Sequence, residues 1–339
     1  MRIATYNIAW FSALFDQHDV LQRDGKWSRM HDVRRAEQAD AIAKVIAAVD
    51  ADLMIIVEAP NTGKTQSTSR ALARFSEHYG LRQTHGLIGF ESHTDQEIAA
   101  LYDPDKLTPV HTPMGGLIGH APRFDQKFEL DIDVDAIPEI HEFSKPPLEL
   151  AVTLPNGTAL RLIGVHVKSK YPRGAKNPAE EQRLAIANRR KQLAQCIWLR
   201  QRVEAHLQAS DDVIVLGDFN DGPGLDNFEK LFGRSGVEVV LGDPKTPETL
   251  LQDPFTKRWL DGLRGATAAT SRFFDAQNRR YINALIDFIM VSPDLAARSD
   301  PKWRIWHPFD DPECYDDHPL REALLTASDH FPVSIDLTL

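Results

Sequence analysis

Short apolar runs recur along this chain, and most of them are rich in β-branched residues. Such runs predict buried strands. The clearest covers residues 213–216, which lead through Gly217 into Asp218 and Asn220 before a Gly-Pro-Gly sequence ends regular structure. Residues two apart in extended backbone project to the same side, so we expect Asp218 and Asn220 to share a face. By itself, this pair fits a turn cap as well as it fits a catalytic pair.

The pattern of hydrophobic positions predicts both strands and helices over most of the chain. Apolar or alternating runs predict strands over residues 1–10, 53–58, 96–103, 148–154, 160–168, 213–217, 284–291, 303–306 and 334–339. Apolar residues at helical spacing predict helices over 36–49 and 66–79, with a shorter helix over 225–232. Asn156-Gly157 lies between two of the predicted strands, and this dipeptide is typical of a tight hairpin.

A long helix is predicted to begin at Asn177-Pro178. A cap residue is followed there by proline at the first helical position and by two glutamates in the first turn. Ile186, Leu193 and Ile197 recur at helical spacing further along, so we expect them to form the buried stripe of this helix.

Residues 113–145 differ from the rest, because they have no clear period and contain several glycines and prolines. They also carry an acidic run, Asp131, Asp133 and Asp135. We interpret this segment as a long insertion or an irregular loop. Elsewhere the chain has no evident repeat or linker, so residues 1–339 are expected to form a single mixed α/β (α+β) domain. Two packed sheets with helices on their outer faces would bury this pattern of strands and helices.

Composition narrows the class of protein. The chain has 339 residues, is 42% hydrophobic and 26% charged, and carries a formal net charge of −10. An acidic chain is not expected to bind nucleic acid through a broad basic face, although clustered carboxylates can hold cations. The two cysteines stand far apart, so neither a disulfide framework nor a zinc site is expected. With no signal-peptide pattern at the start and no apolar stretch that could span a bilayer, we predict a cytoplasmic protein.

Polar residues end several predicted strands where apolar ones would pack better. Asp287 lies in an apolar run, where a carboxylate is costly unless it is paired, and His330 is a natural partner for it. Each of these polar residues has an alternative structural explanation; His166 alone, for example, could be a satisfied buried histidine. Together they favour one shared site at a common sheet edge. The set is Asn7, Glu58, His166, Asp218 with Asn220, Asp287, and Asp329 with His330.

The residues after the strand that carries His166 predict an anion pocket. His166 and Lys168 would face the same way along that strand, and a basic loop with Lys170, Tyr171, Arg173 and Lys176 follows. The acids at the other strand ends offer oxygen ligands, which favour Mg²⁺ or Mn²⁺ over zinc. The chain has no HExxH sequence that would contradict this.

These motifs, in this order, resemble those of the endonuclease/exonuclease/phosphatase superfamily, the fold of pancreatic deoxyribonuclease and of exonuclease III-like enzymes. The stretch from His166 to Lys170 differs from abasic-site endonucleases, which usually carry tyrosine and asparagine there. It is more similar to bacterial members described as nucleases or phosphodiesterases. The motifs are Thr5-Tyr6-Asn7, Val57-Glu58, Gly164-Val165-His166-Val167-Lys168, Gly217-Asp218-Phe219-Asn220, Leu285-Ile286-Asp287-Phe288 and Ser328-Asp329-His330-Phe331-Pro332.

The resemblance implies a four-layered αββα sandwich and divalent-metal-dependent hydrolysis of phosphoesters. It implies Glu58 as the principal metal ligand, with Asn7 and Asp329 in support. Asp218 and Asn220 would orient the attacking water and the phosphate. The resemblance also implies that His330, held by Asp287, acts as general base or stabilises the transition state, and that His166 contacts the phosphate. Lys168, Lys170 and Tyr171 are the expected phosphate-binding side chains.

Three functions remain open from the sequence. The first is a metal-dependent nuclease or phosphodiesterase, which the basic loop favours. The second is a hydrolase of a small or lipid phosphoester, such as sphingomyelin, an inositol phosphate or a nucleotide, which the net charge favours. The third is a binding module that has lost catalysis, which the complete set of motif residues disfavours. No stable protein partner is implied.

Overall fold

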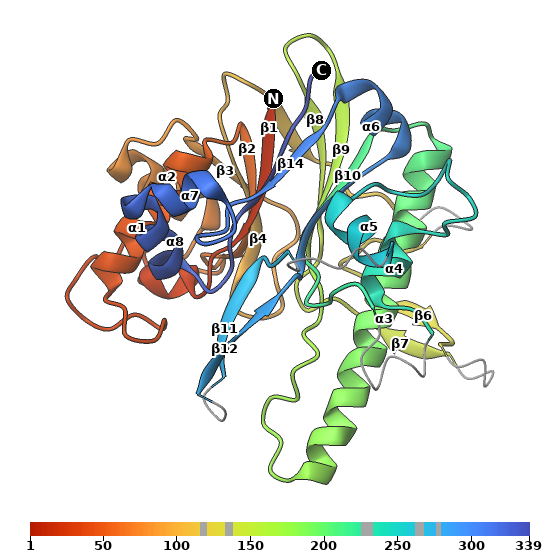
Figure 1. Cartoon of the computed structure of the whole chain (residues 1–339), viewed down its shortest axis with the longest axis horizontal. Helices are drawn as coiled ribbons and strands as arrows, with labels where there is room; N and C mark the ends of the chain where they lie inside the picture. The colour runs from red at the N-terminus through yellow and green to blue at the C-terminus, as the bar shows by residue number, and fades with distance from the viewer. Residues whose placement is uncertain (116–120, 133–137, 225–232, 262–267, 276–278) are drawn as a thin grey trace.

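The computed structural model describes residues 1–115, 121–132, 138–224, 233–261, 268–275 and 279–339. Two mixed sheets pack face to face, with helices on their outer faces (Figure 1). The first sheet has the order β14 (Lys302–Ile305), β15 (Val333–Asp336), β1 (Arg2–Asn7), β2 (Leu53–Ala59), β4 (Glu97–Tyr102) and β3 (His85–Ile88). The second has the order β13 (Asp287–Val291), β10 (Val213–Asp218), β9 (Ala159–His166), β8 (Leu148–Thr153) and β5 (Thr108–His111). This confirms the predicted fold class.

Helices cover each sheet from outside. Against the first sheet lie α1 (Arg35–Val49), α2 (Thr68–Tyr79), α7 (Pro312–Asp316) and α8 (His318–Ala327), with the short 3-10 helix η1 (Phe11–Leu14). Against the second lie α3 (Pro178–Gln208), α4 (Gly236–Leu241) and α5 (Pro254–Leu260), while α6 (Pro293–Ser299) packs at the border of the two sheets. In the described residues, no helix is both long enough and apolar enough to cross a membrane.

Strand alternation builds the core in three layers. In β10, Ile214 and Leu216 face the other sheet, whereas Val213 and Val215 face the helices. β1 alternates in the same way, with Ile3 between the sheets and Tyr6 under α1 and α8. Both faces of these central strands are therefore buried, which explains why their sequences read as continuous apolar runs.

Two short hairpins lie outside the main sheets (Figure 1). One is β11 (Ser271–Asp275) with β12 (Arg280–Ala284), and the other is β6 (Phe128–Leu130) with β7 (Glu139–His141). The second falls within the segment interpreted as a long insertion or an irregular loop, and its strands are regular structure that the sequence did not predict. Phe128 stacks on Trp198 of α3 with ring centroids 4.9 Å apart, and this aromatic contact holds the hairpin on the domain. Asp133 and Asp135 of the acidic run lie outside the described residues, as does the helix predicted over 225–232.

The strand predicted over 284–291 begins later than expected, and a separate strand that was not predicted ends at Ala284. β12 ends at Ala284, and β13 begins at Asp287. The backbone between them turns to other partners, since Ile286 accepts a hydrogen bond from the Phe219 amide and Thr270 accepts one from the Asp287 amide. Asp287 is therefore the first residue of its strand. Similarly, β9 ends at His166, so Lys168 lies beyond the strand that was expected to contain it.

The long helix begins as predicted, with the Asn177 side chain accepting from the Glu180 amide at 2.9 Å. The predicted stripe of Ile186, Leu193 and Ile197 was wrong, because these side chains are only half-buried. The buried face is shifted round the helix to Leu199 and Val203. It also includes the small or amide side chains that an apolar pattern overlooks, namely Ala185, Gln192 and Cys196.

Candidate active site

Strand topology brings the predicted polar residues to one edge of the two sheets. β1 runs parallel to β2, and β9 runs parallel to β10, so their carboxyl ends lie on the same side. β15 and β13 run antiparallel to β1 and β10, which places their starting residues at that same edge. Asp218 and Asp287 are directly opposite in the register, as are Asp218 and His166 on the other side. The shared edge therefore follows from the strand directions.

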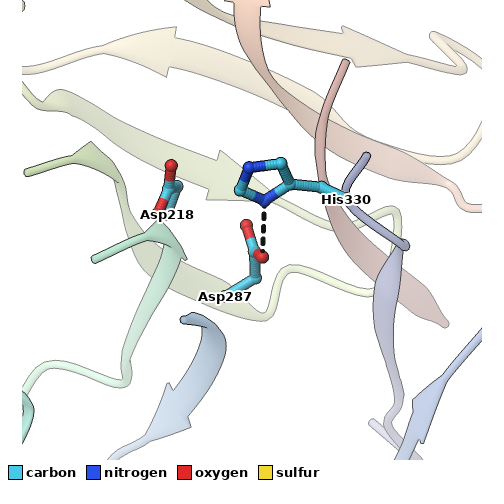
Figure 2. Close-up of side chains that lie close together, drawn as sticks. All are labelled: Asp218, Asp287 and His330. Carbon is cyan, nitrogen blue, oxygen red and sulfur yellow. Dashed lines mark hydrogen bonds and ion pairs between the residues drawn. The ribbon is translucent and has the colours of Figure 1, made fainter. Parts of the chain in front are cut away.

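At the centre of this edge is a buried histidine–aspartate pair. Nδ1 of His330 lies 2.8 Å from Oδ2 of Asp287, and the other ring nitrogen lies on the side of the ring that faces Asp218 (Figure 2). Burial lowers the pKa of His330, but the charge and hydrogen bond of Asp287, with the charge of Asp218, outweigh burial and raise this pKa to about 10. The imidazole is therefore held in one orientation with Nε2 directed into the site.

Asp218 lies beside this histidine within a network of amide donors (Figure 2). Its Oδ2 accepts from Nδ2 of Asn7 at 2.9 Å and from Nδ2 of Asn220 at 3.1 Å, and its Oδ1 accepts from the Asn220 amide at 2.7 Å. Nδ2 of Asn7 also lies 3.4 Å from Nε2 of His330. Burial and the charge of Asp287 raise the pKa of Asp218 to about 7, against the opposing charge of His330.

His166 lies on the other side of Asp218, with Nε2 3.6 Å from Oδ2. Its Nδ1 is buried and has no hydrogen-bond partner among the described residues. Burial, assisted by the positive charges of Lys145, His330 and Lys168, holds the pKa of His166 well below its usual range. One neutral and one charged histidine therefore flank the same carboxylate at neutral pH.

Glu58 is placed by a β-bulge in β2, where the pairing with β4 shifts between Val57 and Ala59. Its φ is +61°, in the left-handed region that non-glycine residues seldom occupy. Trp10 and Gln96, the two residues that donate hydrogen bonds to Oε2 of Glu58 at 2.8 and 2.6 Å, also have positive φ, at +60° and +78°. Such strain persists where the surroundings enforce it, and it is concentrated at functional sites.

Two groups of residues here could hold a metal ion. Oδ1 of Asn7 is buried without a hydrogen-bond partner among the described residues, and both hydrogen bonds to Glu58 end on Oε2, so two hard oxygen atoms have room for a ligand. Burial also raises the pKa of Asp329, against the opposing charge of His330. The ligand atoms of Asp218, Asp287 and His330 form the second group, within 4.8 Å of one another. In that group the 2.8 Å bond between His330 and Asp287 already occupies Nδ1 and Oδ2.

The predicted phosphate-binding side chains lie on the segment that leaves His166. The charge of Lys168 acts on His166, whereas the Lys170 ammonium pairs with the buried carboxylate of Asp221. Tyr171 is exposed, and its carbonyl accepts from Asn188 of α3. Of these three side chains, Lys168 is therefore the one whose charge acts on the histidine–carboxylate cluster, while Lys170 supports the loop.

Several residues of this edge were not predicted. Gln192 donates to the carbonyls of Lys168 and Asn220, both at 2.9 Å, and Gln195 accepts from the Lys168 amide at 2.8 Å. Amides in the middle of a helix give no recognisable motif, so only the structure could reveal these contacts. Lys145 was also overlooked: its charge acts on His166, and the carboxylates of Glu58 and Glu97 act on it in turn. Its place just before a strand, like that of Asp329, is the signal that could have found it.

A model of the Endonuclease/Exonuclease/phosphatase family matches residues 4–330. No curated protein matches the chain. Among solved structures, an endonuclease/exonuclease/phosphatase family protein from Bacteroides thetaiotaomicron is 14% identical with a TM-score of 0.50, covering 99% of this chain and 97% of its own. An AP endonuclease from Archaeoglobus fulgidus is 11% identical with a TM-score of 0.50 and full coverage of both chains. The catalytic domain of Xenopus laevis APE2 is 19% identical with a TM-score of 0.49, covering 100% and 92%. At these identities the structural similarity shows the fold.

Proposed function

Since this chain belongs to the endonuclease/exonuclease/phosphatase family, whose members hydrolyse phosphoester bonds, we propose that it is a divalent-metal-dependent phosphodiesterase or nuclease. The observation that carries the proposal is the buried pair of His330 and Asp287, which directs the second ring nitrogen toward Asn7 and Asp218. A histidine fixed in this way beside a second carboxylate has the geometry that water-mediated hydrolysis requires.

Asn7, Glu58 and Asp329 would hold Mg²⁺ or Mn²⁺. All three offer oxygen atoms, which are the ligands that these hard cations prefer. Two observations on the described residues support this assignment: Oδ1 of Asn7 is buried without a hydrogen-bond partner, and the hydrogen bonds from Trp10 and Gln96 reach Oε2 of Glu58 rather than Oε1. When bound, the cation would supply positive charge beside the phosphoryl oxygens.

Asp218 and Asn220 would orient the attacking water, and an oxygen of Asp218 would accept its proton as the new phosphorus–oxygen bond forms. The phosphorus–oxygen bond to the leaving group would break on the opposite side, and the leaving oxygen would take a proton from solvent. His330 would donate a hydrogen bond from Nε2 to the charge that develops on the phosphoryl group, while Asp287 keeps the ring in place. The raised pKa of His330 agrees with this role, because a protonated ring is a donor at both nitrogens. His166 and Lys168 would bind the phosphate, and Lys170 with Tyr171 would form the adjoining loop.

The second candidate is a hydrolase of a small or lipid phosphoester, and the formal net charge of −10 favours it. A binding module without catalysis is the third. One panel separates them: purified protein with Mn²⁺, tested on plasmid DNA, RNA, sphingomyelin, inositol phosphates and chromogenic phosphate mono- and diesters. We expect diester hydrolysis that a chelator abolishes. Activity confined to monoesters would favour the second candidate. Inactivity on every substrate, with Mn²⁺ and again with Mg²⁺ in its place, would favour the third.

We also retain the prediction that the enzyme works in the cytoplasm and without a stable protein partner. Fractionation of cells that express the tagged chain, followed by gel filtration of the relevant fraction, tests both statements. A membrane-bound or exported pool, or elution with a second protein, would contradict them.

A further inference from the structure

One face of the β11–β12 hairpin carries exposed rings. Phe274 and Tyr281 are direct cross-strand partners with ring centroids 5.3 Å apart, and they are 48% and 56% exposed. Arg272, two residues before Phe274, places its guanidinium 4.0 Å from the Tyr281 ring and 5.1 Å from the ring of Phe309. Phe309 is itself 44% exposed. Large apolar side chains clustered on a surface in this way indicate a binding site.

The same arrangement continues onto the loop before α1. The His31 ring lies 6.1 Å from Phe274, and the Arg29 guanidinium lies 5.0 Å from the Trp10 ring. We call Arg29, His31, Arg272, Phe274, Tyr281 and Phe309 the ring–arginine surface. Within the described residues, neither Arg29 nor Arg272 forms an ion pair with a carboxylate, so both guanidinium groups can receive an external anion.

Both parts of this surface connect directly to the candidate active site. Ser271 forms an isolated bridge with His330, the Arg272 amide donates to the Asp329 carbonyl at 2.7 Å, and the Phe273 ring packs edge-on against His330 at 5.4 Å. On the other side, the Trp10 amide donates to Glu58. From these attachments the hairpin extends away from the sheets (Figure 1). The ring–arginine surface is therefore built on segments that are hydrogen-bonded to the residues of the site.

We propose that the ring–arginine surface binds single-stranded nucleic acid and leads it to the active site; this inference rests on the proposed function. Exposed rings stack on unpaired bases irrespective of sequence, and free arginines pair with the phosphates between them. A duplex keeps its bases stacked inside, and the net charge of −10 gives it no broad basic face to follow. Rings alternating with unpaired guanidinium groups therefore match a single strand better than a duplex.

The test measures binding apart from catalysis. Fluorescence anisotropy in EDTA follows a labelled oligothymidylate of about 12 nucleotides, its duplex with oligodeoxyadenylate, and anionic phospholipid vesicles. The test variant is Phe274→Leu with Tyr281→Leu, which keeps apolar side chains on the hairpin but removes the aromatic rings. Arg272→Gln is a second variant that leaves both rings in place. The matched control is Tyr315→Ala, since Tyr315 is an exposed tyrosine on α7 beneath Arg321.

We expect the wild type to bind the single strand more tightly than the duplex, and the double variant to raise the Kd for the single strand about tenfold or more. Arg272→Gln should raise the same Kd and reduce its dependence on salt. In Mn²⁺, the ratio of kcat/KM on the oligonucleotide to kcat/KM on a chromogenic diester should fall in both variants.

Equal Kd values for wild type and variants, preference for the duplex, or preference for vesicles would each overturn the inference. If the wild type cleaves the chromogenic diester but fails these binding tests, only the inference falls; if it binds the strand but hydrolyses no phosphoester, only the proposed function falls.

Discussion

Nδ1 of His330 and Oδ2 of Asp287 lie 2.8 Å apart, although Asp287 begins β13 of one sheet and His330 lies in the segment that leads into β15 of the other. The contact joins the start of β15 to the start of β13 at the edge where the other predicted site residues gather. Since each residue is buried, neither can be altered without leaving a polar group of the other unpaired. The pair should therefore behave as one unit.

The first prediction follows from this coupling. His330→Ala should lower turnover by about 10²-fold or more, the scale for losing a hydrogen-bond donor to the charge of the transition state. Asp287→Asn should cost a comparable factor, because the ring is no longer held or polarised. The double variant should be little worse than either single variant, since residues that act as a unit are not additive. Turnover at saturating Mn²⁺ measures all three; losses that multiply would show that the residues work separately.

The second prediction separates the metal ligands from the residues that handle water. Glu58→Gln should weaken Mn²⁺ binding and recover part of its turnover at high metal concentration, because it removes a charged oxygen ligand. Asp218→Asn should abolish turnover while Mn²⁺ still binds. Titration calorimetry with Mn²⁺ measures affinity without any substrate. The same loss of affinity in both variants would refute the division of roles.

The third prediction concerns Gln192, whose amide supports the carbonyls of Lys168 and Asn220 from α3. Gln192→Met preserves volume but removes both hydrogen bonds, so the two loops should lose their relative positions. We expect kcat to fall by about tenfold, as a misplaced catalytic group would cause, while the affinity for Mn²⁺ is unchanged. Gln182→Met, at an exposed position of the same helix, is the control. Equal kcat values in the two variants would show that Gln192 only fills space.

The sequence predicts the polar residues at the shared sheet edge better than the backbone geometry and hydrogen bonds that hold them in place. The strand-end residues Asn7, Asp218 and His330 could be identified because apolar runs mark the strands and a polar residue at the end of a run stands out. The bulge that places Glu58 could not, because it depends on how β2 pairs with β4. The contacts of Gln192 likewise depend on which face of α3 meets the sheet, and the apolar pattern indicated the wrong face.

The exposed hairpin illustrates the same limit. Neither of its strands was predicted, and the strand predicted over 284–291 overlaps β12 only at Ala284. The backbone divides there because Thr270 takes the amides of Ile286 and Asp287, a tertiary contact without a sequence motif. β12 is therefore free to pair with β11 and to carry the ring–arginine surface.

The last prediction uses Asp253, which caps α5 by accepting from the Thr256 amide at 2.7 Å. Burial raises the pKa of Asp253 from its usual value to about 6. A folded-state pKa above the unfolded one means that ionisation opposes folding, so this contribution to stability is greatest below about pH 4 and is lost as the pH rises through about 6. Asp253→Asn keeps the capping acceptor but cannot ionise. Relative to wild type, it should gain free energy of unfolding between pH 4.5 and pH 8, up to an upper bound of about 3 kcal/mol at 1.4 kcal/mol per pKa unit.

The control is Asp311→Asn at the cap of α7. The hydrogen bond and charge of Arg304 lower the pKa of Asp311 despite burial, so this variant should lose stability relative to wild type as the pH rises. Urea unfolding of the three proteins at both pH values measures these changes. A pH-independent difference between Asp253→Asn and wild type would show that Asp253 ionises in the folded protein as readily as in the unfolded chain.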